Sequence, residues 1–200
     1  MLNSMPSNVI AICNQKGGVG KTTTAINLAA ALAGIGKKIL ILDLDPQGNA
    51  STGLGIEYSE RSNSIYEVLS RLIPFDDGIK KTNLENLFIV PSNVELSGIE
   101  PELANENDKA FVLKSIMNDS QSINNFDYIF IDCPPALSLL TIMAMTAANS
   151  VLVPLQCEFF ALEGLSQLIK TVDRVHKNLN PLLSIDGIIL TMFDKRNKLS

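Results

Sequence analysis

Short apolar runs alternate with stretches of helical periodicity along the whole chain. Each run is bounded by Gly, Pro, Asn or Asp, as expected for buried strands of a parallel sheet. The predicted strands are residues 9–13, 38–44, 87–90, 128–131, 150–155 and 184–191. The predicted helices are residues 22–33, a segment from Ser64 to Pro74, two helices within 94–118 with a break near 105–108, and residues 138–148 and 162–179. In the second of these, Ser62 or Ser64 is expected to cap the helix, and Ile65, Val68, Leu69 and Leu72 are expected to face inward.

This alternation predicts an α/β fold with a three-layer, doubly wound, mostly parallel sheet and helices on both faces. No repeat or linker divides the chain, so residues 1–200 are expected to form one domain with one sizeable core. The apolar segments are too short to cross a bilayer, and the first residues lack the apolar core of a secretory signal. We therefore expect a cytoplasmic protein that makes no membrane contact.

A glycine-rich segment lies between the first strand and the first helix. Residues 13–24 read Cys-Asn-Gln-Lys-Gly-Gly-Val-Gly-Lys-Thr-Thr-Thr. Glycines let successive backbone N–H groups converge on a polyphosphate, and the helix that follows adds the positive end of its dipole. Lys21 is placed to reach the β- and γ-phosphates, and the Thr22 hydroxyl to bind Mg²⁺. The predicted nucleotide-binding residues are Lys16, Gly17, Gly18, Val19, Gly20, Lys21, Thr22 and Thr23.

This loop departs from the usual phosphate-binding pattern at two positions. Gln15 stands where G-x-x-x-x-G-K-[ST] has its first glycine, and Lys16 adds a second lysine before the glycines. The alternative interpretation is a glycine-rich turn with a solvated lysine. The agreement of several mechanistic positions at one spacing favours phosphate binding.

Acidic residues lie at or directly after the carboxyl ends of two of the other predicted strands. Residues 43–49 read Asp-Leu-Asp-Pro-Gln-Gly-Asn, and residues 132–135 read Asp-Cys-Pro-Pro. Ligands bind at the carboxyl ends of strands in open α/β sheets, so both segments are expected beside the glycine loop. Asp132 is predicted to hold the Mg²⁺ shell through a water, although a lone aspartate at a strand end is often only a cap for the next turn.

Charge and cysteine content exclude few classes of function. The net charge of −5 disfavours a surface that binds nucleic acid as a whole and leaves open a local basic patch, including one assembled across a dimer. Cys13, Cys133 and Cys157 are far apart in the sequence and odd in number, which argues against a disulfide framework. We interpret Cys133 as a core thiol.

The glycine loop, the Asp43 and Asp132 segments and residues 156–164, Gln-Cys-Glu-Phe-Phe-Ala-Leu-Glu-Gly, occur in the order seen in one known family. Together they resemble the ParA/Soj chromosome-partition ATPases of the ParA/MinD group, which are P-loop NTPases with a deviant Walker A loop. The similarity spans nearly the whole chain. The Asp-Pro-Gln-Gly-Asn form is typical of the ParA/Soj branch rather than of its MinD relatives.

The resemblance implies an enzyme that binds ATP with Mg²⁺ and hydrolyses ATP slowly as a sandwich homodimer. Lys16 would stabilise phosphate charge across the dimer interface, and Asp45 would position the attacking water. Such dimers bind DNA without sequence preference, a ParB-like partner stimulates hydrolysis, and the protein would associate with the nucleoid. With Lys21, these residues are the predicted catalytic set.

The family continues beyond the segment 190–194 with further sheet and helix, so the domain is expected to be C-terminally truncated. Lys195, Arg196 and Lys198 would form a short basic tail, and Thr191 and Met192 lie where relatives approach the base. Two other functions stay open: a MinD-like positioning ATPase and a small-molecule kinase similar to dethiobiotin synthetase. The former would need a basic amphipathic helix, and the latter an acceptor pocket.

Overall fold

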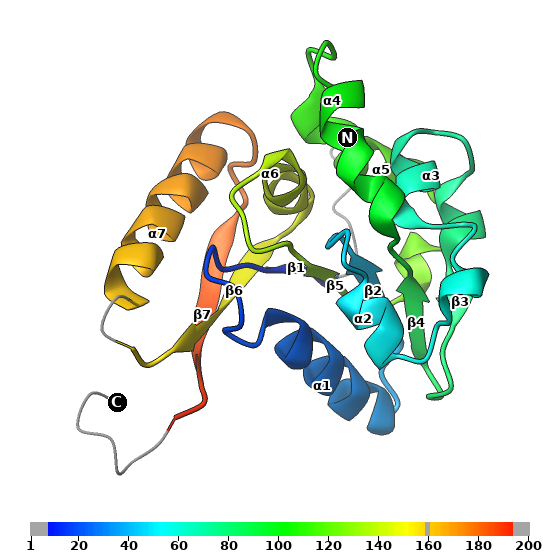
Figure 1. Ribbon diagram of the computed structural model, residues 1–200, viewed down its shortest axis with the longest axis horizontal. Helices are drawn as coiled ribbons and strands as arrows, with labels where there is room; N and C mark the ends of the chain where they lie inside the picture. The colour runs from blue at the N-terminus through cyan, green and yellow to red at the C-terminus, as the bar shows by residue number, and fades with distance from the viewer. Residues whose placement is uncertain (1–7, 159–160, 194–200) are drawn as a thin grey trace.

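A seven-stranded sheet forms the centre of the molecule in a computed structural model that describes residues 8–158 and 161–193 (Figure 1). The strand order is β3-β4-β2-β5-β1-β6-β7, and all neighbours are parallel except β3, which is antiparallel to β4. The strands are β1 (Asn8–Ile12), β2 (Ile39–Asp43), β3 (Lys80–Lys81), β4 (Leu87–Val90), β5 (Tyr128–Asp132), β6 (Ser150–Gln156) and β7 (Ser184–Thr191). The predicted mostly parallel sheet is confirmed.

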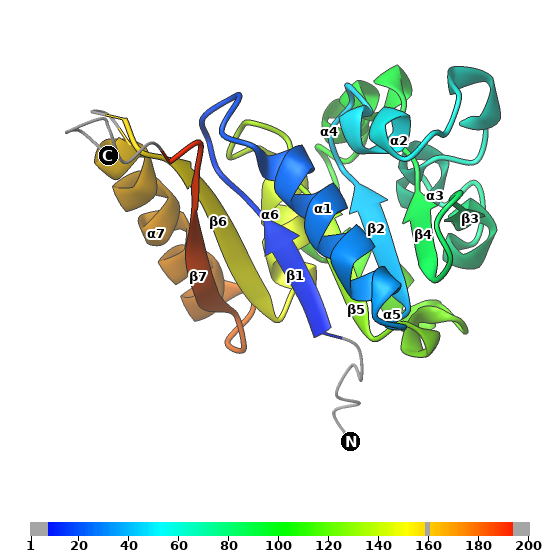
Figure 2. The same ribbon diagram turned by 90° about the horizontal axis from the view of Figure 1, so that it is seen from below.

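Helices cover both faces of this sheet, which gives the predicted three layers. Figure 2 shows α1 over one face of β1, β5 and β2, with α6 and α7 behind the sheet. The helices are α1 (Lys21–Gly34), α2 (Asn49–Gly53), α3 (Ile65–Leu69), α4 (Ile99–Glu102), α5 (Val112–Asp119), α6 (Leu139–Ala147) and α7 (Ala161–Asn178). Short 3₁₀ turns occur at Tyr58–Glu60, Phe75–Gly78, Val94–Gly98, Lys109–Phe111 and Ile123–Asn125.

Two apolar cores lie on the two sides of the sheet. On one side the small residues Ala25, Ala29 and Ala33 recur at helical spacing on α1 and let this helix pack closely on Phe130 and its neighbours. The larger core lies on the other side and includes side chains of α3, α5, α6 and α7. All five residues of β2 are buried, as expected for a central parallel strand covered on both faces.

The segment after Ser64 differs from its prediction. The Ser64 hydroxyl accepts a hydrogen bond from the Tyr66 N–H at 3.1 Å, so the predicted N-cap is confirmed. The helix ends at Leu69, however, and Arg71 adopts a left-handed conformation with φ 58°. This reversal turns the chain outward, and the Leu72 side chain is 67% exposed; its predicted inward orientation is wrong.

The long helix α7 is amphipathic. It buries Leu168, Val172 and Val175, while Lys170 and Arg174 lie exposed. Across the described part of the chain, none of the helices combines the length and the apolar character needed to cross a membrane.

Candidate functional site

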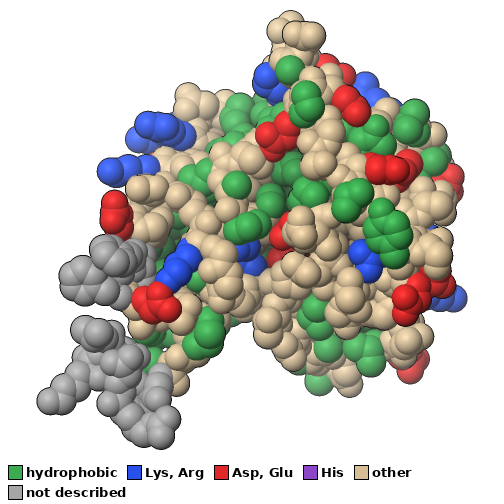
Figure 3. All heavy atoms as spheres, in the orientation of Figure 1, with side chains coloured by type: hydrophobic (Ala, Val, Ile, Leu, Met, Phe, Trp, Pro, Cys, Tyr) green, Lys and Arg blue, Asp and Glu red, His purple; other side chains and the backbone are tan. Residues whose placement is uncertain are grey.

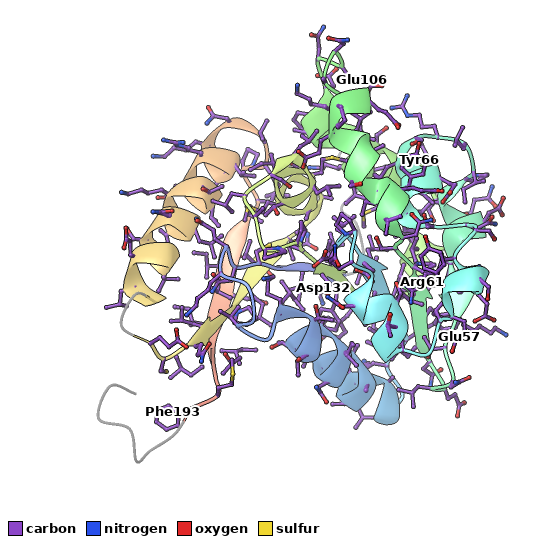
Figure 4. The ribbon with its side chains drawn as sticks, viewed as in Figure 1. Glu57, Arg61, Tyr66, Glu106, Asp132 and Phe193 are labelled. Atoms are coloured by element: carbon purple, nitrogen blue, oxygen red, sulfur yellow. The ribbon has the colours of Figure 1, made fainter. Side chains whose placement is uncertain are left out.

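The carboxyl ends of β1, β5 and β2 meet at one edge of the sheet. Asp132 at the end of β5 is the register partner of Ile12 in β1 and of Asp43 in β2. The glycine loop leaves β1 and the acidic loop leaves β2, so the two predicted motifs lie on either side of Asp132. Figure 4 shows Asp132 near the centre of the molecule. The fold therefore brings together the segments that the sequence placed in one site.

The glycine loop has an open cradle of main-chain donors. Gly18 and Gly20 have φ values of 74° and 87°, a left-handed conformation that favours glycine. Within residues 8–158 and 161–193, no hydrogen bond is made by the N–H groups of Gly17, Gly18 and Gly20. Asn14 anchors the loop, because it accepts from the Lys16 N–H at 3.0 Å and donates to the Pro154 carbonyl at 2.7 Å. This arrangement fits a phosphate group.

Lys21 lies inside this loop. Its side chain is buried, with 7% of the residue exposed, and its ammonium donates to the Lys16 carbonyl at 3.1 Å. Burial lowers the pKa of Lys21, while the charges of Asp132 and Asp45 act in the opposite direction. Lys21, the first residue of α1, thus places its ammonium group within the loop, where contact with the phosphates was expected.

Asp132 is a buried carboxylate beside Thr22 and Lys21. In the described part of the chain neither of its oxygens has a hydrogen-bond partner, although the residue is fully buried. Burial, and next the charge of Asp43, raises the pKa of Asp132 to about 7, against the opposing effects of the Thr22 hydroxyl and Lys21. An unpaired buried carboxylate next to a hydroxyl and a phosphate cradle fits a Mg²⁺ shell.

The protein would supply only part of that shell. The described residues contain no group of three His, Cys, Asp or Glu side chains able to hold a metal ion. Mg²⁺ commonly keeps several waters and is bound through one or two carboxylates plus substrate phosphates. Thr22 and Asp132 fit such a site as its protein ligands.

Asp43 organises the acidic loop. Its carboxylate accepts from the Ser51 hydroxyl at 2.7 Å and N–H at 2.8 Å, and from the Asp45 N–H at 3.2 Å. Burial raises the pKa of Asp43 to about 6 in spite of these bonds. Asp45 in turn accepts from the Gln47 N–H at 3.0 Å. Asp43 therefore positions Asp45, the residue predicted to orient water. The sequence did not indicate this role of Asp43.

Arg61 is a second positioning residue that sequence reasoning missed. Its guanidinium is buried and donates to the Ile56 carbonyl at 2.8 Å and 3.1 Å, and to the Thr52 hydroxyl at 2.8 Å. It also donates to the carbonyls of Gly48 and Ser92, both at 3.4 Å. In Figure 4 it lies across α2 from Asp132. Arg61 therefore holds the loop that carries Asp45.

Lys16 lies outside the loop that its backbone helps to form. Its ammonium pairs with the carboxylate of Glu158, and the two side chains are 43% and 44% exposed. Glu158 belongs to the segment 156–164, which the sequence singled out without giving Glu158 a role. Phe159 and Phe160 in that segment, and the basic tail at 195–198, lie outside the described residues.

The end of β7 packs against the glycine loop. The Thr191 hydroxyl donates to the Val19 carbonyl at 2.8 Å, and Met192 follows with φ 51° and 58% exposure. Both residues thus border the site, and their approach to a base stays a prediction.

Curated bacterial proteins are similar to this chain over nearly all of its length. A family model described as an AAA domain matches residues 7–185. The chain is 51% identical over its full length to the chromosome partitioning protein ParA of Caulobacter vibrioides and covers 74% of that protein. It is also 51% identical, over 96% of its length, to the sporulation initiation inhibitor protein Soj of Bacillus subtilis, of which it covers 75%.

Solved structures share the fold. A cobyrinic acid a,c-diamide synthase from Mycobacterium smegmatis, with bound ATP analog and magnesium, superposes with a TM-score of 0.89 at 37% identity, over 96% of this chain and 75% of that one. A plasmid partition protein from Borrelia burgdorferi gives 0.82 at 30% identity, over 96% and 81% of the two chains. With its motifs placed in one site, the chain belongs to the ParA/Soj family of partition ATPases.

Proposed function

We propose that this protein is an ATP-dependent dimerising switch for chromosome or plasmid partition. One observation carries the proposal: Lys21 and the unpaired Asp132 converge inside the glycine loop, whereas Lys16 lies outside it on Glu158. A single chain therefore has groups for phosphate and Mg²⁺, whereas its second loop lysine points away from them and is held by an exposed ion pair with Glu158. A second copy that places Lys16 at the phosphates would complete the site.

Each residue has a role in this proposal. Residues 17–23 bind the phosphates through main-chain donors and Lys21, and Thr22 and Asp132 hold the metal. Mg²⁺, when bound, neutralises charge that develops on the phosphate oxygens. Asp45 orients the attacking water, and Lys16 of a second copy stabilises the transferred phosphoryl group. Phosphoryl transfer depends on positioning and charge, so a site completed only in the dimer hydrolyses ATP slowly and works as a timer.

We further propose that the dimer binds DNA without sequence preference and that a ParB-like partner stimulates hydrolysis. The names of the Caulobacter and Borrelia relatives support a role in partition. On the face shown in Figure 3, Lys and Arg side chains are interspersed with Asp and Glu. Together with the net charge of −5, this argues against DNA binding by one face of a single copy, so the proposal places DNA on a patch that two copies assemble.

A second candidate is small-molecule chemistry at the same loop. It is favoured by the likeness to the Mycobacterium smegmatis synthase. That function would need an acceptor pocket within one chain and would not need Lys16 from another. The dependence of the reaction rate on protein concentration therefore separates the two functions.

The test is the ATPase rate measured against protein concentration, with and without non-specific DNA. A dimerising switch gives a rate that rises more steeply than linearly, and DNA raises it at low concentration. Lys21→Ala should abolish ATP binding in calorimetry, Lys16→Ala should bind ATP without forming dimers, and Asp45→Ala should accumulate ATP-bound dimers. A strictly linear rate that Lys16→Ala leaves unchanged would refute the switch and favour chemistry within one chain.

A further inference from the structure

Cys13 and Cys133 bring two free thiols together at the base of the glycine loop. β1 and β5 are parallel neighbours in which Ile12 is the register partner of Asp132. Cys13 and Cys133 are the next residues of these two chain segments. Their Sγ atoms lie 3.1 Å apart, and each residue is only 1% exposed. The sequence does not indicate that these two thiols are neighbours, because 120 positions separate them.

The local geometry suits a disulfide. Bridged cysteines have Cα atoms about 4.4 to 6.8 Å apart, and neighbouring strands are about 4.8 Å apart. The Cys133 N–H donates to the Ile12 carbonyl at 3.3 Å, so the two segments are still in contact at this point. An S–S bond is about 2.05 Å long, so the sulfur atoms must approach by about 1 Å, through rotation of the side chains together with a shift of the backbone at Cys13.

We propose that Cys13 and Cys133 form a reversible oxidation site, whose disulfide ties the glycine loop to the strand that carries Asp132 and lowers nucleotide affinity. The oxidant is hydrogen peroxide. One thiol attacks the O–O bond, which gives a sulfenic acid and water; the second thiol attacks this sulfur, and the hydroxyl leaves as a second water. Two thiols are oxidised to one disulfide while both peroxide oxygens are reduced to water.

The environment of the pair sets which oxidant can act. Both thiols are nearly enclosed by the protein, so the oxidant reaches them rarely and the reaction is slow. Bulky disulfides such as oxidised glutathione are too large for sulfur atoms that are nearly enclosed, whereas peroxide is close to water in size. Cys157 is half-buried, in the segment after β6, and serves as the internal control thiol.

The effect on nucleotide binding follows from the neighbouring residue. Cys13 precedes Asn14, whose side chain anchors the loop through the Lys16 N–H and the Pro154 carbonyl. Drawing Cys13 toward Cys133 displaces this anchor, and with it the main-chain N–H groups that are proposed to bind the phosphates. In catalysis, a misplacement of about 1 Å can cost on the order of a hundredfold in rate. We expect oxidation to lower the nucleotide affinity by about tenfold, a smaller effect than this hundredfold change in rate. This half of the proposal rests on the proposed function.

The first measurement identifies the bond. The full reduced chain is treated with hydrogen peroxide, its remaining thiols are alkylated, and intact mass and peptide maps are recorded without reductant. Wild type and Cys157→Ser should lose the mass of two hydrogens in a Cys13–Cys133 peptide, while Cys13→Ser and Cys133→Ser should not. The free thiols of wild type should fall from three to one and return with dithiothreitol. Unreacted thiols, sulfinic acids, or cross-links through Cys157 would overturn the proposal. If a serine variant does not fold, the peptide map of the wild-type chain still shows whether the Cys13–Cys133 bond forms.

The second measurement uses a fluorescent ATP analog with reduced, oxidised and re-reduced chain. Affinity should fall on oxidation and recover with dithiothreitol in wild type and Cys157→Ser. Equal affinity of the oxidised and reduced forms would overturn the regulatory half. If the reduced chain binds no nucleotide, the proposed function fails as well, whereas the mass measurement still decides whether the bond forms.

Discussion

Asp43 makes the stability of the free chain depend on pH. Its pKa of about 6 lies above the ordinary value of 3.8, so the folded chain binds more protons than the unfolded chain between these values. The free energy of unfolding therefore falls as pH rises through this window. The contribution of Asp43 amounts to about 2 kcal/mol between about pH 4 and pH 7. Asp132, with a pKa of about 7, extends the same trend to higher pH.

We predict that Asp43→Asn reduces this slope in urea unfolding of the nucleotide-free chain. The neutral amide keeps an oxygen for Ser51 and removes the buried charge. Asp127→Asn is the matched control, because the Lys38 N–H lowers the pKa of this exposed carboxyl and its titration lies below the window. An Asp43→Asn slope equal to that of wild type would contradict the assignment.

The ion pair between Lys16 and Glu158 competes with the proposed role of Lys16 in a dimer. Both side chains are nearly half exposed, so one such pair is worth less than about 1 kcal/mol. A dimer must break two of these pairs. We therefore predict that Glu158→Gln lowers the dissociation constant of the ATP-bound dimer about fivefold, as measured by sedimentation.

Glu163→Gln controls for this experiment, since it removes the same charge from an exposed position on α7. It should leave the dimer dissociation constant unchanged. If Glu158→Gln weakens the dimer, Glu158 stabilises the assembled site rather than the separate chain.

The acidic loop and α2 depend on Arg61. A Cβ on Gly48 would lie 2.4 Å from the Arg61 Nη1, which shows how closely the guanidinium packs on this backbone. We predict that Arg61→Met destabilises the chain by roughly 3 kcal/mol, because it leaves buried carbonyls without donors. Arg61→Lys should recover only part of the loss, since an ammonium cannot reproduce the planar set of donors. Urea unfolding measures both, and Arg174→Met on the exposed face of α7 should change little.

Elements stabilised by local pattern were predictable, and elements that depend on distant contacts were not. The apolar runs of β1, β2 and β5 and the small-residue spacing of α1 carry their own signal. The α2 helix, Asn49–Gly53, lacks one, because all of its residues except Ala50 are poor helix formers. It is held instead by Ser51 on Asp43 and by Arg61. The two-residue strand β3 is too short for any periodicity.

The same division applies to the candidate site. Lys21, Thr22 and Asp132 belong to motifs, and the structure brings them together as expected. The Lys16–Glu158 ion pair joins residues separated by 142 positions, and Arg61 reaches the Ser92 carbonyl across 31 positions. No motif marks these contacts, because they depend on which strand ends become neighbours in the folded sheet.

The two edges of the sheet differ in how they are protected. β3 is two residues long and bears Lys80 and Lys81, which discourages pairing with another chain. β7 is eight residues long, and its apolar side chains Ile188 and Leu190 are 46% and 53% exposed. In the described part of the chain, β6 is the only strand that pairs with β7. In this chain, which spans 74% of the length of the Caulobacter relative, a long apolar edge of this kind favours association between molecules.

We predict that the nucleotide-free chain self-associates through β7 as its concentration rises, and that the double variant Ile188→Lys, Leu190→Lys suppresses this. Two added cations on one edge repel a second copy and remove apolar area, so the sedimentation coefficient should become independent of concentration. The control is Ile35→Lys, Leu182→Lys, which adds the same charge at apolar residues that are 74% and 80% exposed but lie off the edge. Equal suppression by both double variants would mean that net charge, and not the β7 edge, governs association. If only the β7 variant loses self-association, the contact lies at the β7 edge of the sheet.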